Sequence, residues 1–177
     1  NLQPNKDHVT VLHGWRAFLD SINPGFPLPK LLFLGRRGST YTAIDSLVSQ
    51  LQLTDSVEIL GEVNNVYSYL VQCDVALHAA KDEGLPNAVL EEMVCGLPIV
   101  AVGIPGVLEA LPSATHSLTF KPNHSAELAD RLRLLFHSPE LRKRFGSANR
   151  SHANNTFTTD VLLKRTLSAM RISSITG

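Results

Sequence analysis

Two glutamates, Glu83 and Glu91, are the residues whose type and spacing most directly suggest chemistry in this sequence. Seven residues separate them, with Glu83 in a polar loop and Glu91 one turn into the helix expected after it. Because helical side chains lean back toward the N-terminus of their helix, both carboxylates are expected to point toward one opening at the protein surface. This opening, between Glu83 and Glu91, is called the mouth below. An isolated pair of this kind is more often two solvated side chains, so the surrounding residues decide between the two interpretations.

The backbone between these glutamates, from Gly84 to Ala88, is expected to lie at a helix N-terminus. A helix N-terminus carries partial positive charge and unpaired N–H donors, which favour an anion such as a phosphate. A carboxylate pair beside such an anion site suits a ligand with both hydroxyls and phosphates. A nucleotide sugar is a ligand of that chemical type.

The elements that must position this mouth follow from the flanking residues. The apolar run Val75–Ala80 predicts a strand buried on both faces, and residues 87–95 then carry apolar side chains at helical spacing. Gly96 and Pro98 predict the end of that helix, and Ile99–Val102 is the next buried strand. The loop therefore lies at the carboxyl end of a parallel strand, where open α/β sheets bind ligands.

The continuous string E-E-M-V-C-G-L-P-I-V closely resembles E-x-M-x-x-G-x-P-V-V, the signature of retaining nucleotide-sugar glycosyltransferases of family 4, which have the GT-B fold. By this resemblance Glu91 holds the ribose hydroxyls of the donor and Glu83 the hydroxyls of the donor sugar. The amides of the loop and helix start bind the sugar and diphosphate. The substrate-binding residues of that segment are then Gly84, Leu85, Pro86 and Asn87.

Two further segments resemble the same family. N-L-Q-P-N-K-D-H resembles its first turn, so Lys6 corresponds to the lysine that binds the donor diphosphate, while Asn1 stands where the family has an arginine. Val63, after the expected strand 57–60, is placed against the nucleobase by the resemblance. The turn from Gly103 resembles G-G-V-P-E, with Pro105 in place of its first glycine.

Composition bounds the classes of function. The chain has 177 residues, 44% of them hydrophobic and 18% charged, which is ordinary for one globular domain. Its net charge of zero gives no overall attraction to nucleic acid. Cys73 and Cys95 lack metal-ligand spacing and are expected to be thiols in a reducing compartment, the cytoplasm, with a disulfide as the minor alternative. The seven histidines form no paired ligand spacing, and His78 reads as a core histidine near the mouth.

The fold class expected is α/β, a doubly wound parallel sheet with helices on both faces, Rossmann-like and similar to the C-terminal domain of GT-B enzymes. Residues 1–177 are expected to form a single donor-binding domain, with C-terminal helices over about 138–177. The expected strand order leaves an empty central slot between 31–34 and 75–80, which residues upstream of Asn1 or another chain should fill. The remaining elements expected are helices at 8–22, 44–51, 66–70, 125–136, 139–154 and 159–172, and a strand at 116–120.

The function implied by the resemblance is the donor-binding half of a nucleotide-sugar-dependent retaining glycosyltransferase. It would transfer a hexose-type sugar to a saccharide or lipid-linked acceptor, with Lys6 and Glu83 as catalytic residues and neither a metal nor another cofactor. The acceptor site would come from an N-terminal domain of a longer protein, which could also attach it to the cytoplasmic face of a membrane. The 177-residue chain alone is therefore expected to transfer nothing.

Two alternatives stay open at this stage. One is a sugar-nucleotide epimerase of the same architecture, and the other is a non-catalytic, degenerate donor-binding subunit. Asn1 and Pro105 favour the degenerate subunit, whereas the intact Lys6, Glu83 and Glu91 favour an enzyme.

Overall fold

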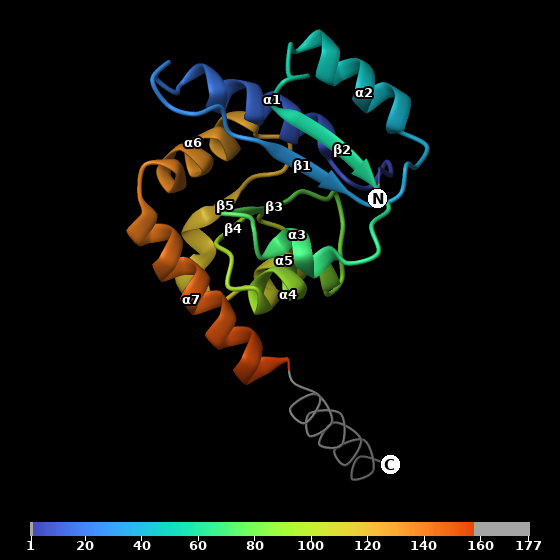
Figure 1. Cartoon of the computed structure of the whole chain (residues 1–177). Helices are drawn as coiled ribbons and strands as arrows, with labels where there is room; N and C mark the ends of the chain where they lie inside the picture. Colours follow the sequence, from blue (N-terminus) through green and yellow to red (C-terminus); the bar gives the residue numbers. More distant parts are fainter. Residues whose placement is uncertain (1, 158–177) are drawn as a thin grey trace.

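The computed structural model describes residues 2–157. Helices and strands alternate along most of this length, as the sequence predicts (Figure 1). The strands are β1 (Leu31–Leu34), β2 (Val57–Gly61), β3 (Ala76–His78), β4 (Ile99–Val102) and β5 (Thr119–Phe120). The helices are α1 (His8–Asp20), α2 (Tyr41–Gln50), α3 (Val66–Leu70), α4 (Asn87–Val94), α5 (Pro105–Ala110), α6 (Ser125–Phe136) and α7 (Pro139–Thr156), with a 3-10 helix, η1, at Ser113–Leu118.

All strand pairings among the described residues are parallel. Strands β1 and β2 form one sheet, and β3, β4 and β5 form a second sheet in that order. The order β2-β1 followed by β3-β4-β5 agrees with the sequence prediction, and within residues 2–157 no pairing joins β1 to β3. The filling of this slot by upstream residues or another chain stays a prediction.

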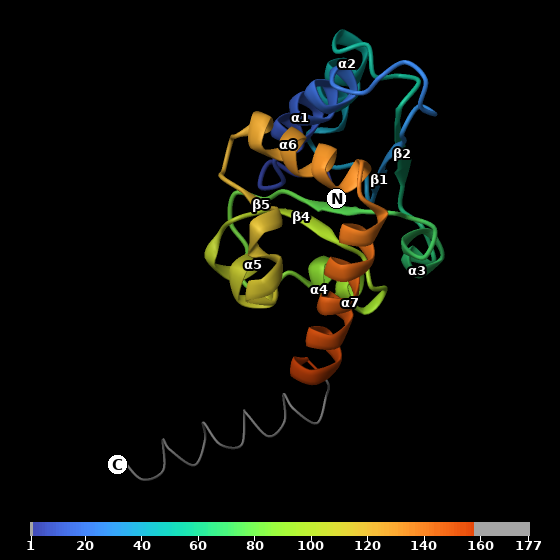
Figure 2. The same cartoon turned by 90° about the vertical axis from the view of Figure 1, so that its left-hand side faces the viewer.

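Helices cover both faces of the strands, which confirms the doubly wound architecture. Helices α1, α2 and α6 lie on one side, and α3, α4 and α5 lie on the other (Figures 1 and 2). Helix α7 packs against α4. None of the helices in the described part of the chain combines the length and apolarity that crossing a membrane requires.

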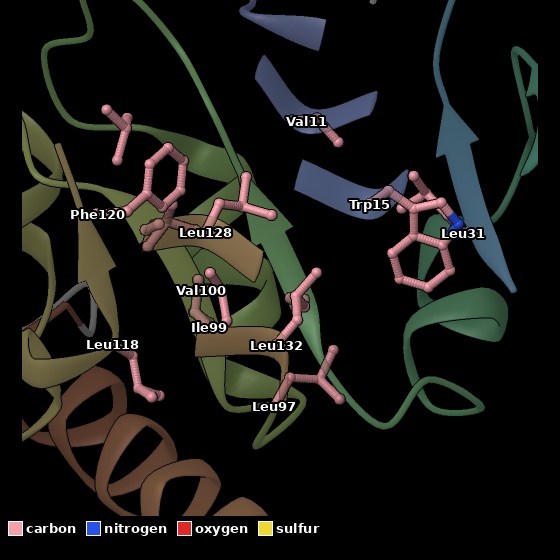
Figure 3. Packing of buried hydrophobic residues seen from close by; sticks show 14 of the residues in the cluster. Val11, Trp15, Leu31, Leu97, Ile99, Val100, Leu118, Phe120, Leu128 and Leu132 are labelled. Carbon is pink, nitrogen blue, oxygen red and sulfur yellow. The ribbon is translucent and has the colours of Figure 1, made fainter. Parts of the chain in front are cut away.

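The core is centred on β4, every residue of which is buried. Leu128 and Leu132 of α6 cover the strand on one side, near Ile99 and Val100 (Figure 3). Strands buried on both faces read as continuous apolar runs, and that pattern is what made β4 recognisable in the sequence. Strand β4 is therefore the rigid centre from which the neighbouring loops project.

The prediction of a strand over 116–120 was largely wrong. Residues Ser113–Leu118 form a 3-10 helix, and only Thr119–Phe120 pair as a strand. The buried Thr115 hydroxyl donates to the Pro112 carbonyl oxygen at 2.9 Å, and such local side-chain bonds favour a turn over a sheet ladder. The segment predicted as a turn from Gly103 begins helix α5, and the predicted helix 159–172 lies outside the described residues.

Candidate functional site

The N-terminal stretch lies across the carboxyl ends of β1 and β3. The amide of Lys81 donates to the carbonyl oxygen of Asn5 at 2.8 Å, and the amide of Asp7 donates to that of Ala79 at 3.3 Å. At the other sheet, the amide of Leu2, a residue only 2% exposed, donates to the carbonyl oxygen of Arg36 at 3.1 Å. This stretch thus holds its side chains at the sheet edge where ligands bind.

Lys6 projects from this stretch and forms an ion pair with Glu83. The two residues are 77 positions apart in the sequence and both side chains are mostly buried, with 28% of Lys6 and 19% of Glu83 exposed. Asp7, the next residue, caps α1 by accepting a hydrogen bond from the Thr10 amide. The helix start therefore fixes the direction in which the chain leaves Lys6.

Helix α5 packs directly against the loop that carries Glu83. Gly106, in the first turn of that helix, comes so close that an added Cβ would overlap the carbonyl oxygens of Glu83 and Gly84. Only glycine permits this approach. Pro105, the residue before it, occupies the first helical position, where its missing N–H leaves no hydrogen bond unmade.

Helix α4 points its N-terminus at the same mouth. Pro86 precedes its first residue, Asn87, and no side chain caps the helix start. The first-turn N–H groups of any helix lack an intrahelical acceptor, and here no capping side chain takes its place, which favours a bound anion. The residues predicted for this role lie in order along the loop and the first helical turn, as Gly84, Leu85, Pro86 and Asn87.

The opposite end of α4 is fixed by α7. Arg150 donates from Nη2 to the Cys95 carbonyl oxygen at 2.6 Å and from Nε to that of Val94 at 3.2 Å. Asn149 donates from Nδ2 to the Leu97 carbonyl oxygen at 2.7 Å. A cation bonded to the last carbonyl groups stabilises the helix dipole, so α7 holds α4 in its orientation toward the mouth.

Glu91 lies on the exposed side of α4, on the wall of a cavity of about 510 Å³. The cavity lies between α3, α4 and the end of α7. The half-buried Val63 lies in the loop between β2 and α3, ahead of the lining residues. The cavity is lined by Val66, Tyr67, Leu70, Leu90, Glu91, Val94, Cys95, Ala153, Asn154 and Phe157.

Two titratable groups near this site have buried polar atoms, the buried His78 and the half-buried Glu92. His78, at the end of β3, is 6% exposed, and burial lowers its pKa to about 4; the Lys6 charge adds to this and Glu83 opposes it. Burial raises the pKa of Glu92 to about 8, with a further rise from Glu91 and an opposing effect from Lys6. At pH 7 the folded protein therefore holds His78 in its neutral form and Glu92 mainly in its neutral form.

Neither His78 nor Glu92 has its hydrogen bonds completed. Nε2 of His78 and Oε2 of Glu92 are buried without a hydrogen-bond partner among the described residues. The sequence interpretation of His78 as a core histidine was right about its burial. Glu92 escaped sequence reasoning because it follows Glu91 directly and reads as a second solvated carboxylate.

Within residues 2–157 no group of three or more His, Cys, Asp or Glu side chains is arranged to hold a metal ion. Positive charge at the mouth comes from Lys6 and from the start of α4. Both can attract an anion.

Comparison with known sequences supports the family suggested above. The model of the family described as "Glycosyl transferases group 1" matches residues 1–152. The chain is 26% identical over 136 residues to N-acetyl-alpha-D-glucosaminyl L-malate synthase of Bacillus anthracis, covering 77% of this chain and 35% of that protein. It is 32% identical over 99 residues to an uncharacterized glycosyltransferase of Haemophilus influenzae, covering 55% of this chain and 28% of that protein. The chain thus spans about a third of these curated relatives.

Solved structures share the fold. Anabaena Alr3699/HepE in complex with UDP-glucose superposes with a TM-score of 0.80 at 20% identity, over 98% of this chain and 47% of that one. A mutant of S. aureus TarM, in complex with Fondaparinux, alpha-GlcNAc-glycerol and UDP, superposes with a TM-score of 0.85 at 19% identity, over 95% of this chain and 33% of that one. At these identities the likeness shows a common fold.

Proposed function

Because the chain belongs to the glycosyl transferases group 1 family, we propose that it is the donor-binding half of a retaining glycosyltransferase. It transfers a hexose-type sugar from a nucleotide sugar to a saccharide or lipid-linked acceptor, as part of glycan synthesis. The observation that carries this proposal is the meeting of Lys6, Glu83 and the uncapped start of α4 at one sheet edge. The similar folds of HepE with UDP-glucose and TarM with UDP support a nucleotide sugar as the ligand.

The diphosphate, the sugar and the nucleoside of the donor each contact a different part of the mouth. Lys6 and the first-turn amides of α4 neutralise the diphosphate, which leaves as the bond to the sugar breaks. Glu83 accepts hydrogen bonds from the sugar hydroxyls, and Glu91 accepts them from the ribose. The base lies toward Val63 and the cavity between α3 and α4. Leaving-group neutralisation is assigned here to protein groups, so the proposal calls for no metal ion.

The acceptor lies outside this binding half. An N-terminal domain of the same protein supplies the acceptor site and the second wall of the donor site, in the cytoplasm or at the cytoplasmic face of a membrane. The orientation of two reactants is worth about 7–11 kcal/mol of activation free energy when they are well aligned. Without that domain the second wall is missing, so the chain binds the donor weakly. It also transfers nothing, because the acceptor is not oriented.

A non-catalytic donor-binding subunit is the second candidate function, and the epimerase is the third. Pro105 was a reason to consider a degenerate site, but it starts α5 without disturbing the helix, and Gly106 makes the close approach to the loop. That observation favours the enzyme over the degenerate subunit. Asn1 lies outside the described residues.

The proposal is tested by ligand-observed NMR with UDP, GDP and ADP sugars on this chain, followed by a transfer assay with candidate acceptors on the chain joined to its N-terminal domain. We expect saturation transfer to one nucleotide series and its loss in Lys6→Met. Lys143→Met, which removes an exposed lysine on α7, is the matched control and should bind as the wild type does. Absence of binding to all three nucleotide series would refute the proposed function.

A further inference from the structure

We propose that the Lys6–Glu83 ion pair makes this site discriminate against free nucleoside diphosphate in favour of the intact nucleotide sugar. The inference rests on the proposed function of the same site. Glu83 is paired with the Lys6 ammonium, the cation that a phosphate needs. Any phosphate ligand therefore has to displace the Glu83 carboxylate before Lys6 can bind it. The two kinds of ligand differ in what they offer the displaced carboxylate.

The pair is better shielded from water than other ion pairs of the described chain. Its side chains are 28% and 19% exposed, whereas the side chains of Arg36 and Glu62 are 73% and 63% exposed. Shielding from solvent strengthens the attraction between opposite charges, while exposed pairs contribute little. Glu83 is therefore a real competitor for Lys6.

The backbone on both sides keeps the two groups together. Lys6 is flanked by the hydrogen bonds of Asn5 and Asp7 to the chain beyond β3. The loop at Glu83 is in contact with Gly106 of α5, which leaves no room for the loop to move toward that helix. Release of Lys6 thus requires a side-chain exchange at fixed backbone positions.

A free nucleoside diphosphate makes this exchange unfavourable. Its terminal phosphate takes Lys6 and leaves the Glu83 carboxylate without a cation, close to a group that carries nearly two negative charges at pH 7. His78, next to the pair, is held neutral by burial and supplies no compensating charge. Glu91 and Glu92 supply none either. The terminal phosphate and Glu83 therefore repel one another.

With an intact nucleotide sugar, the same exchange of partners changes the free energy little. Its second phosphate is esterified and carries a single negative charge, which lowers the repulsion. The hydroxyls of the sugar donate hydrogen bonds to Glu83 in place of the Lys6 ammonium. After transfer these hydroxyls leave with the product, so re-forming the Lys6–Glu83 pair helps to expel the nucleoside diphosphate.

The test is calorimetric titration of UDP and UDP-glucose into the wild type, Glu83→Gln and Lys6→Met. We expect Glu83→Gln to bind UDP about tenfold more tightly than the wild type and to gain nothing for UDP-glucose. The difference should shrink at high ionic strength. Lys6→Met should bind both ligands more weakly. Glu58→Gln, which removes an exposed carboxylate from β2, is the matched control and should change UDP affinity less than twofold.

The outcomes separate this inference from the function beneath it. Unchanged or weaker UDP binding by a folded Glu83→Gln variant, in a protein whose wild type binds UDP-glucose, overturns the inference and leaves the proposed function standing. Glu83→Asp, which keeps the charge, should return UDP affinity toward the wild-type value. Absence of binding by UDP, GDP and ADP nucleotides in every variant overturns both.

Discussion

Glu92 offers the sharpest test of the physical reasoning, because a carboxyl group with a buried, unpaired oxygen works against folding. It lies on α4 with Oε2 buried and unpaired among the described residues. Burial is the main cause of its raised pKa, with a contribution from Glu91 and an opposing one from Lys6. Replacing it with glutamine removes the ionisable group and keeps its size.

The magnitude follows from the pKa, which rises from 4.5 to about 8 on folding. At about 1.4 kcal/mol per pKa unit, the full shift corresponds to about 5 kcal/mol. Water that reaches the carboxyl reduces this value, and the amide of glutamine also loses hydrogen bonds to water on burial. We therefore expect Glu92→Gln to raise the free energy of unfolding at pH 8 by about 2–3 kcal/mol.

The size of the stability difference between Glu92→Gln and the wild type depends on pH. Below pH 4.5 the carboxyl is protonated in both the folded and the unfolded protein, so ionisation contributes nothing to the difference. As the pH rises from 4.5 to about 8, the unfolded protein ionises first and the wild type loses stability that the variant keeps. The stability difference between variant and wild type should therefore grow across this window and level off above it.

Urea unfolding of both proteins at intervals from pH 4 to pH 9 measures this difference directly. Glu58→Gln, in which an exposed carboxylate is replaced, should stay within about 0.5 kcal/mol of the wild type at every pH. A stability difference that does not change with pH, or a variant less stable than the wild type at pH 8, would refute the reasoning.

The remaining predictions concern the groups around the mouth. His78→Asn should lose less stability than the wild type on acidification from pH 6.5 to pH 4, by up to about 3 kcal/mol in urea unfolding, because the wild-type histidine is protonated first in the unfolded protein. Gly106→Ala should displace the loop and weaken nucleotide-sugar binding about tenfold by calorimetry, whereas Gly25→Ala, where an added Cβ meets no atom within 4 Å, should leave it unchanged. Arg150→Met should lower stability by about 1–2 kcal/mol in thermal unfolding, through loss of the bonds to the end of α4; an unchanged melting temperature would contradict this. Glu91→Ala should weaken nucleoside diphosphate binding about tenfold or more in the same titrations, and equal affinity would show that it does not bind ribose.

Much of the fold could be predicted from local patterns in the sequence. The predicted boundaries of α3 and α6 and the predicted start of α7 agree with the structure. The start of α7 was predictable because Ser138 is a helix-capping residue and Pro139 favours the first helical position. Gly96 takes the left-handed φ of 75° just after α4, as a glycine followed two residues later by Pro98 predicted. These signals are local, since the residues that decide each boundary lie within one helical turn of it.

The sequence by itself thus determined the order and limits of most elements and the parallel strand order, and it predicted the mouth through a resemblance covering most of the chain. Only the tertiary structure decided which side chains meet there. Lys6 and Glu83 are paired across 77 positions, and Gly106 supports their loop from a third segment. Burial of Glu92 depends on what packs around α4, so no pattern near position 92 encodes it. Long-range packing sets charge and contact at the site, because solvent exclusion is a property of the whole fold.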